Sequence, residues 1–249
     1  MLITIFDTET TGLNLKEDKI IDLAGVNYDT KHKTILNVFN MLINYENFIL
    51  PEFIVELTGI TKEMLTDLAV TPDCAYYHFM DFIRSSQYIL SHNYFRFDGP
   101  ILKSNFERTK QKSNINLELR NEIIALDSLI DVPYPKSIKI RQLKYLAMEH
   151  GYIMAKAHRA LDDVLALTHI ISKYDFKDIL NYSQEEQLEL IAPKDVVNFQ
   201  NRHLAKDNGF HFNGEAKEWV RIIKQHELQD VLEQLEFTPA ILPVFREKN

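Results

Sequence analysis

The sequence predicts a mixed α/β protein in which helices flank a central sheet, followed by a small C-terminal α+β unit. Three apolar, β-branched runs open the chain at residues 2–6, 20–28 and 34–45, and from Pro51 onward helical patterns alternate with short strands. Beyond about residue 180, short strands and helices surround the sequence Asn213-Gly214, which is a strong hairpin signal. Strands first, and then strands alternating with helices, are typical of a mixed sheet with helices on its faces.

The first strand, residues 2–6, ends in two carboxylates at a spacing of two, Asp7 and Glu9. Residues two apart on an extended backbone point to the same side, so both carboxylates face one point. Two like charges at this separation raise each other's pKa unless a cation lies between them. The spacing therefore indicates a divalent-metal site, whereas two acids that simply leave the strand for solvent are the alternative for an isolated pair.

The other elements follow from local signals along the chain. Thr61 is a candidate N-cap for a helix over 62–68, and Thr71-Pro72 begins a helix that should extend to about Ser85. Further expected elements are short strands at 88–90 and 123–126, and helices ending near 108 and spanning 141–149, 157–174 and 184–190. After Pro193 we expect a helix ending near 207, the hairpin, a helix over 225–235 and a last strand over 240–245. The predicted domains are residues 1–180 and 181–249.

Composition excludes several classes of protein. The chain has 249 residues, of which 45% are hydrophobic and 26% are charged, as in an ordinary globular protein. Cys74 is the only cysteine, so no intrachain disulfide is possible, and Cys74 as a hydrolase nucleophile has only His78 nearby in the sequence. No apolar run approaches the length of a membrane span, and strand residues begin at once without a charged leader. We therefore expect a cytoplasmic protein with no membrane partner.

Two later segments carry acids at the edges of predicted elements. One is Asp98, at the start of a helix, and the other is His158-Arg159-Ala160-Leu161-Asp162-Asp163. Taken singly, Asp98 is typical of a helix N-terminus, His158 of a surface residue and the aspartate pair of a first helical turn. Their order after Asp7 and Glu9 makes the combined pattern specific.

In that order the segments resemble the three motifs of the DEDDh (DnaQ-like) 3′–5′ exonuclease superfamily, including its proofreading-subunit and exonuclease X type members. The first is Phe6-Asp7-Thr8-Glu9-Thr10-Thr11-Gly12-Leu13, the second is His92-Asn93 through Phe97-Asp98, and the third is H-x-A-x-x-D beginning at His158. Leu57-Thr58-Gly59-Ile60-Thr61 also resembles a turn common in this superfamily. The resemblance covers about residues 1–175. It departs in one place, because Asp98 lies five positions after Asn93 where many members have four.

The resemblance implies a ribonuclease-H-like fold and hydrolysis of phosphodiesters with two divalent metal ions, Mg²⁺ or Mn²⁺. Two such ions neutralise charge on the attacking and leaving oxygens, and hard ions take oxygen ligands. By the family pattern Asp7 would bridge both ions, Glu9 and Asp163 would hold one, and Asp98 would support the other. His158 would be the general base.

The choice between Asp162 and Asp163 depends on where the helix begins. On a continuous helix Asp162, four residues after His158, would share its face, whereas Asp163 would not. If His158 lies on the loop before the helix, that argument lapses and the motif spacing selects Asp163. We expect Asp163 to be the ligand and Asp162 to be a first-turn acid.

The resemblance also implies contacts with the nucleic acid. Backbone near Thr10 and Thr11 would approach the terminal nucleotide, and Leu13 would contact its base, although Leu13 could equally be a core residue. His92 and Asn93 would contact substrate or support the loop that carries Asp98. Arg159 ends a locally basic stretch that could contact phosphates or form a solvated face: Lys136, Lys139, Arg141, Lys144, Lys156 and Arg159.

We therefore expect a metal-dependent 3′–5′ exonuclease that acts on nucleic acid with a free 3′ end, DNA rather than RNA, and releases nucleoside 5′-monophosphates. The alternative is a catalytically silent nucleic-acid-binding or scaffold protein of the same fold, which would be expected to lack one of the five site residues. A polymerase is a further expected partner. A sliding clamp is another, because residues 187–191 faintly resemble a clamp-binding peptide, although Ser183 and Glu186 suggest a capping box and an ordinary helix there.

Overall fold

The computed structural model describes the chain except for residues 47, 114–122, 139, 155–157, 215 and 245–249. The chain divides into two compact units. The first contains Met1–Leu129 and Gln142–Phe176, and the second contains Ile130–Arg141 and the residues from Lys177 on. The segment Ile130–Arg141 thus belongs with the C-terminal part of the chain, while the domain limits of 1–180 and 181–249 stay a prediction.

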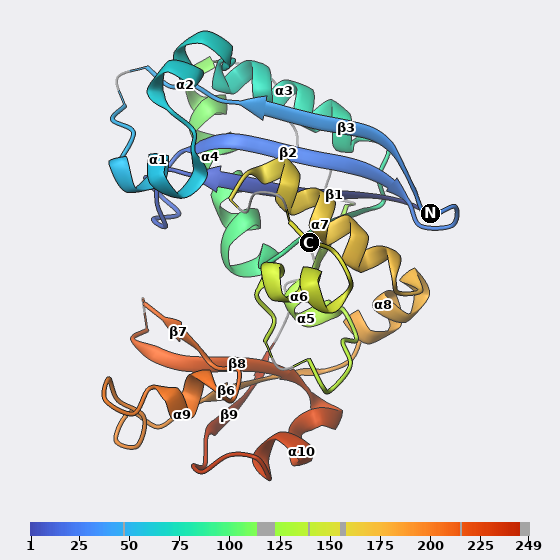
Figure 1. Ribbon diagram of the computed structural model, residues 1–249, viewed down its shortest axis with the longest axis vertical. Coiled ribbons are helices and arrows are strands. Elements are labelled where there is room, and N and C mark those ends of the chain that lie inside the picture. Colours follow the sequence, from blue (N-terminus) through green and yellow to red (C-terminus); the bar gives the residue numbers. More distant parts are fainter. Residues whose placement is uncertain (47, 114–122, 139, 155–157, 215, 245–249) are drawn as a thin grey trace. The chain divides into compact units, whose positions relative to one another are not determined.

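The first unit is built on a five-stranded mixed sheet with the strand order β3-β2-β1-β4-β5 (Figure 1). The first three strands pair in antiparallel fashion, and β4 and β5 add in parallel on the other side of β1. This arrangement confirms the predicted α/β class and the opening run of three strands. The strands are β1 (Leu2–Thr10), β2 (Ile20–Asp29), β3 (Thr34–Leu42), β4 (Tyr88–Ser91) and β5 (Ile124–Asp127).

Helices cover both faces of this sheet. Helix α7 packs against β1 and β2 on one face, and α3 and α4 lie on the other (Figure 1). Phe6 points to the face of α3, where its ring packs 5.7 Å from that of Phe79. Because side chains alternate along a strand, Asp7 and Glu9 point to the opposite face, toward α7. The helices of this unit are α1 (Glu52–Thr58), α2 (Lys62–Leu68), α3 (Pro72–Ile83), α4 (Gly99–Ser113), α5 (Ser128–Asp131), α6 (Leu143–Glu149) and α7 (Ala160–Ser172), with a π-helical turn η1 at Tyr94–Asp98.

Local signals explain where several helices begin and end. The Thr61 side chain accepts a hydrogen bond from the Met64 N–H at 3.2 Å, which confirms the predicted cap of α2. Gly59 adopts φ +70° and ends α1, a left-handed conformation that glycine adopts without steric cost. Among the described helices, none is long and apolar enough to cross a membrane.

The second unit contains a four-stranded sheet with the order β7-β8-β6-β9, all of whose pairs are antiparallel. Strands β7 and β8 pair in antiparallel fashion, as predicted for a hairpin, with Asn213 as the last residue of β7 and Gly214 immediately after it. The expected helix over 225–235 is shorter, a 3-10 turn followed by α10. The elements are α8 (Phe176–Ser183), which begins at the junction of the units, β6 (Gln187–Ile191), α9 (His203–Lys206), β7 (His211–Asn213), β8 (Glu218–Lys224), η2 (Gln225–Glu227), α10 (Leu228–Leu232) and β9 (Ala240–Val244).

The predicted helix over 184–190 is wrong. Gln187–Ile191 is strand β6, hydrogen-bonded to β8 on one side and to β9 on the other. Leu188 and Leu190 alternate with Gln187 and Glu189, which is the period-two pattern of a strand. The capping box is also wrong, because the Ser183 hydroxyl donates to the Leu180 carbonyl within α8 at 2.7 Å.

Candidate metal centre

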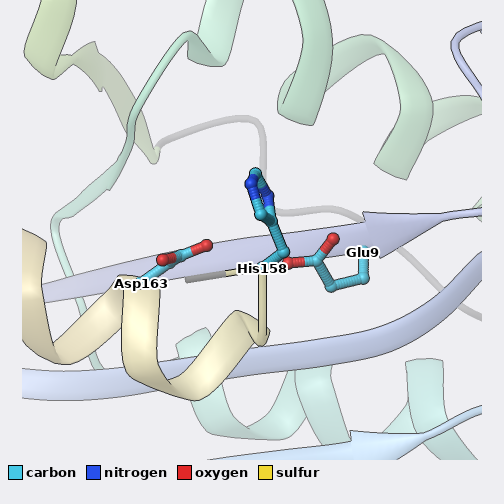
Figure 2. A group of neighbouring side chains, drawn as sticks. All are labelled: Glu9, His158 and Asp163. Atoms are coloured by element: carbon cyan, nitrogen blue, oxygen red, sulfur yellow. The ribbon is translucent and has the colours of Figure 1, made fainter. Parts of the chain in front are cut away.

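The site lies where the end of β1 meets the beginning of α7. Glu9, His158 and Asp163 each offer a ligand atom, and these atoms lie within 4.8 Å of one another. Figure 2 shows Asp163 on the first turn of α7, Glu9 beside it, and the His158 imidazole between them on the segment that leads into the helix. Residues far apart in the sequence thus come together as the motif order predicts.

The pKa of Asp7 is raised by burial and by several neighbouring carboxylates. Burial raises the pKa of the Asp7 carboxyl well above its usual range, and the negative charges of Asp98, Asp163 and Glu9 raise it further. Asp7 therefore experiences electrostatic repulsion from carboxylates on β1, η1 and α7.

Glu9 and Asp163 are perturbed in the same direction. Burial raises the pKa of Glu9 to about 8, with Asp163 adding to the shift and Arg159 opposing it. Burial also raises the pKa of Asp163 to about 7, although the backbone N–H of His158 donates to this carboxylate and lowers it. A cation bound beside such buried acids would favour their ionised forms and lower their pKa values.

Asp98 lies at the end of the π-helical turn and is 3% exposed. The Thr8 hydroxyl donates to one carboxylate oxygen at 2.7 Å and the Ser91 hydroxyl donates to the other at 3.2 Å. Burial raises the pKa of Asp98 to about 7 despite these two hydrogen bonds. A π-helical turn contains one residue more than an α-helical one, which accounts physically for the longer spacing between Asn93 and Asp98.

The turn before Asp98 is held by Asp127, a residue that the sequence analysis did not select. This buried carboxylate accepts from the backbone N–H groups of Asn93 at 2.9 Å, Phe95 at 3.2 Å and Leu129 at 2.9 Å. Asn93 adopts φ +78° within this turn. Asp127 ends a short apolar strand, and that position was the available signal.

His92 lies in the same supporting region. Its Nδ1 is 2.7 Å from the hydroxyl oxygen of Ser128, the first residue of α5. Of the two interpretations of His92 and Asn93, these contacts favour support of the Asp98 turn. Substrate contact by either residue stays a prediction.

The structure places His158 outside the helix. His158 adopts φ +64°, a left-handed conformation, and α7 begins two residues later at Ala160. The argument that placed Asp162 on the face of His158 required a continuous helix and therefore lapses. Asp163 is the aspartate that groups with Glu9 and His158, while its role as a metal ligand stays a prediction.

Asp22 is a fifth acid at the site, and the sequence analysis missed it. It lies on β2 directly opposite Glu9 in the strand register and is 0% exposed. Its Oδ2 accepts a hydrogen bond from Arg159 Nε at 3.2 Å. The available signal was a lone charge in an otherwise apolar strand.

Side-chain hydrogen bonds hold the loop after β1, which carries Leu13 at its surface. The Thr10 hydroxyl donates to the Gly12 carbonyl at 2.6 Å, and the Thr11 hydroxyl donates to Asp18 at 2.7 Å. A Cβ on Gly12 would lie 2.5 Å from an Asp18 oxygen, so any other residue there would require the Asp18 side chain to shift. Leu13 is 82% exposed, so the alternative that it is a core residue is wrong.

The basic stretch is divided between the two units. Lys136 forms an ion pair with Asp230, and Arg141 lies 5.6 Å from the ring of Tyr134, all within the second unit. Lys144 and Arg159 belong to the first unit. Lys139 and Lys156 lie outside the described residues.

The donors of the site suit hard divalent ions. The carboxylates of Glu9 and Asp163 lie together, and those of Asp7 and Asp98 interact with them electrostatically. All four have raised pKa values, and Mg²⁺ and Mn²⁺ are the ions that prefer carboxylate oxygens. A cation among these acids would favour their ionised forms and remove the repulsion between them. The residues therefore fit a site for divalent metal ions.

Comparisons with known proteins identify the family of the chain. A family model described as "Exonuclease" matches residues 4–171. The chain is 29% identical over 200 residues to a PolC-type DNA polymerase III from Clostridium perfringens, and 30% identical over 169 residues to one from Staphylococcus epidermidis. Those matches cover 80% and 68% of this chain, but only 13% and 11% of the polymerases.

Solved structures of E. coli exonuclease I share the fold. The zinc-bound complex of that enzyme with single-stranded DNA superposes with a TM-score of 0.62 at 16% identity, and its complex with a dA16 oligonucleotide with a TM-score of 0.60. Each match covers 77% of this chain and 48% of the other. At this level of identity the likeness concerns the fold, and the chain spans about half the length of these neighbours.

Proposed function

The chain belongs to the exonuclease family, in its DEDDh (DnaQ-like) 3′–5′ branch with a ribonuclease-H-like fold, and on this premise we propose that it removes nucleoside 5′-monophosphates from the 3′ end of DNA with two divalent metal ions. The observation that carries the proposal is the grouping of Glu9, His158 and Asp163, with Asp7 and Asp98 as charged neighbours. The chemistry of these side chains supports metal-dependent hydrolysis of a phosphodiester.

The four acids would hold the ions. Asp7 would contact both, Glu9 and Asp163 would contact one, and Asp98 would contact the other. The bound ions would neutralise charge on the phosphate and make water more acidic. Mg²⁺ and Mn²⁺ are the proposed ions, because the donors are oxygens.

The chain's own side chains would perform the remaining tasks. His158, which is exposed, would take a proton from the attacking water, since imidazole accepts protons near neutral pH. Leu13, held in a loop braced by Thr11 and Asp18, would pack against the terminal base. The backbone near Thr10 would approach the terminal nucleotide.

DNA is the proposed substrate, and the names of the relatives support this choice. The curated relatives are DNA polymerases, and the structural neighbours include complexes of exonuclease I with single-stranded DNA. A polymerase partner stays a prediction. The clamp-binding interpretation of residues 187–191 finds no support, because both edges of this strand are already hydrogen-bonded. A cytoplasmic location also stays a prediction.

Digestion of 5′-labelled oligonucleotides tests the proposal. Matched single-stranded and duplex DNA and RNA would be incubated with Mg²⁺ or Mn²⁺, and the products resolved as ladders. We expect DNA to shorten one nucleotide at a time from the 3′ end, with 5′-mononucleotides released, and no digestion after chelation of the metal. Faster digestion of RNA would overturn the choice of substrate, and shortening from the 5′ end would overturn the activity.

A further inference from the structure

Asp22 and Arg159 form a buried ion pair beside the proposed metal ligands, and the mechanism above assigns no role to Asp22. We propose that this pair is a positioning device that fixes the His158 turn over the carboxylates, so that Arg159 serves catalysis through His158 rather than by binding phosphate. The inference rests on the proposed exonuclease activity, and its test distinguishes the two.

The position of Asp22 is energetically unfavourable for a carboxylate. Asp22 is 0% exposed and lies directly opposite Glu9 on the neighbouring antiparallel strand. Like charges directly opposite each other destabilise a sheet, and a buried carboxylate is costly unless it is paired. The positive charge of Arg159 lowers the pKa values of both Asp22 and Glu9. The ion pair therefore offsets part of the repulsion between Asp22 and Glu9 on the neighbouring strands β1 and β2.

The ion pair connects β2 to the residue that precedes α7. Arg159 Nε donates to Asp22 Oδ2 at 3.2 Å, with the Arg159 side chain 25% exposed. The backbone N–H of Ala160, the first residue of α7, also lies where it lowers the pKa of Asp22. Asp22 Oδ1 has no hydrogen-bond partner among the described residues. One carboxylate on β2 thus holds the residue that immediately follows His158.

The turn at His158 and Arg159 has a strained backbone. His158 adopts φ +64°, which is unusual for a residue other than glycine, and Arg159 at φ −134° is the N-cap of α7. The Arg159 side chain does not cap the helix. Asp163 receives the His158 N–H, and the Asp163 N–H donates to the Arg159 carbonyl at 3.1 Å. Local bonds therefore tie the turn to α7, and the Asp22 pair ties it to the sheet that carries Glu9.

The two roles of Arg159 predict different kinetics. A phosphate ligand would mainly raise KM when removed and would reduce the dependence of binding on salt. A residue that orients His158 would lower kcat and leave substrate binding unchanged. Asp22 separates the roles, because a buried acid beside Glu9 cannot attract phosphate.

The experiment measures single-turnover digestion of 3′-labelled DNA by wild type, Asp22→Asn, Arg159→Gln, His158→Ala and the double variant His158→Ala/Asp22→Asn. We expect Asp22→Asn and Arg159→Gln each to lower the rate of cleavage by about 10- to 100-fold, the usual effect of groups that orient catalytic ligands. KM should stay within about 2-fold of wild type, a change of about 0.4 kcal/mol. In the His158→Ala background, Asp22→Asn should have no further effect, because its action passes through the imidazole.

Asp162→Asn is the control, since it removes a half-buried aspartate from the first turn of α7 that lies outside the group of Glu9, His158 and Asp163, and it should leave the rate unchanged. Thermal unfolding establishes that each variant folds, and Arg159→Gln, at a partly exposed position, carries the test if Asp22→Asn does not fold. The positioning role would be overturned if the effects of the two substitutions on the rate multiplied in the double variant. It would also be overturned if Arg159→Gln raised KM and reduced the salt dependence of binding while Asp22→Asn cleaved DNA at the wild-type rate. Inactive wild-type protein would instead overturn the proposed function.

Discussion

Single residues at the site illustrate what local sequence can and cannot predict. Asp7 and Glu9 were predictable because a spacing of two on a strand places both side chains on one face. The pairing of Asp22 with Arg159 was not, because it depends on the register of β1 with β2 and on the docking of α7 against them. Residues that depend on such long-range packing escape a search for local motifs.

The raised pKa values of the acids predict a pH-dependent response to metal. Without metal, the folded protein binds protons at Asp7, Glu9, Asp98 and Asp163 more tightly than the unfolded chain, whose acids titrate near pH 4. This contribution to stability is complete below about pH 4 and is lost as the pH rises toward about 8. Metal binds the deprotonated acids, so Mg²⁺ should raise Tm more at pH 8 than at pH 6.

The measurement is a series of thermal melts across pH, with and without Mg²⁺. The variant Asp7→Asn is the control, because it should flatten the pH dependence of the metal-free protein and reduce the Mg²⁺ effect. An equal response to Mg²⁺ at both pH values would contradict the assignment of these acids to a metal site.

The two aspartates of the third motif should differ sharply. Asp163 groups with Glu9 and His158, whereas Asp162 does not, so Asp163→Ala should lower the rate of digestion by at least about 100-fold. Asp162→Ala should change it by less than about 3-fold, because Asp162 is not among the grouped ligand atoms. Nuclease assays on both purified variants decide the matter, and an inactive Asp162→Ala beside an active Asp163→Ala would reverse the assignment.

At the scale of elements, turns and strands depart from the sequence predictions in instructive ways. The π-helical turn Tyr94–Asp98 accommodates the extra residue of the second motif, which a count of residues alone could not show. Strand β6 was predicted as a helix, because Gln187–Ile191 is too short for its alternation to decide between the two and its partners, β8 and β9, lie far along the chain. The strands β1 to β3 were predictable because they are long, apolar and close together in sequence.

The loop after β1 should act in substrate binding and contribute little to stability. Leu13→Ala removes an 82% exposed side chain, so the free energy of unfolding should change by less than about 0.5 kcal/mol. Loss of its contact with the terminal base should raise KM by about 10-fold, equivalent to about 1.4 kcal/mol. Leu68→Ala is the matched control, a 68% exposed leucine on α2. An unchanged KM for Leu13→Ala would remove Leu13 from the substrate site.

At the scale of the whole molecule, the chain folds as two units, and the second recruits a segment from the middle of the sequence. Ile130–Arg141 begins within α5, yet it belongs with the residues from Lys177 on. Lys224 on β8 is 1% exposed, with its ammonium 3.9 Å from a carboxylate oxygen of Asp131 and 4.8 Å from the ring centroid of Tyr182. A buried ion pair therefore joins the segment to the C-terminal sheet.

Breaking this ion pair should destabilise the protein. Lys224→Met removes the ammonium that lies 3.9 Å from the buried carboxylate of Asp131, which should lower the free energy of unfolding by about 3–5 kcal/mol. Adding Asp131→Asn removes the uncompensated charge and should restore much of the loss. Denaturant unfolding of the single and double variants measures both effects, and a single variant as stable as wild type would show that the pair contributes nothing to the fold.

The central claim is that the acids at the end of β1 perform metal-dependent cleavage at a DNA 3′ end. The most direct test compares wild type with Asp7→Ala on 3′-labelled single-stranded DNA in Mg²⁺, after thermal melts have shown that both proteins fold. Wild type should release labelled mononucleotide from the start, and Asp7→Ala should release at least about 100-fold less in the same time. Release at the wild-type rate by Asp7→Ala would contradict the account.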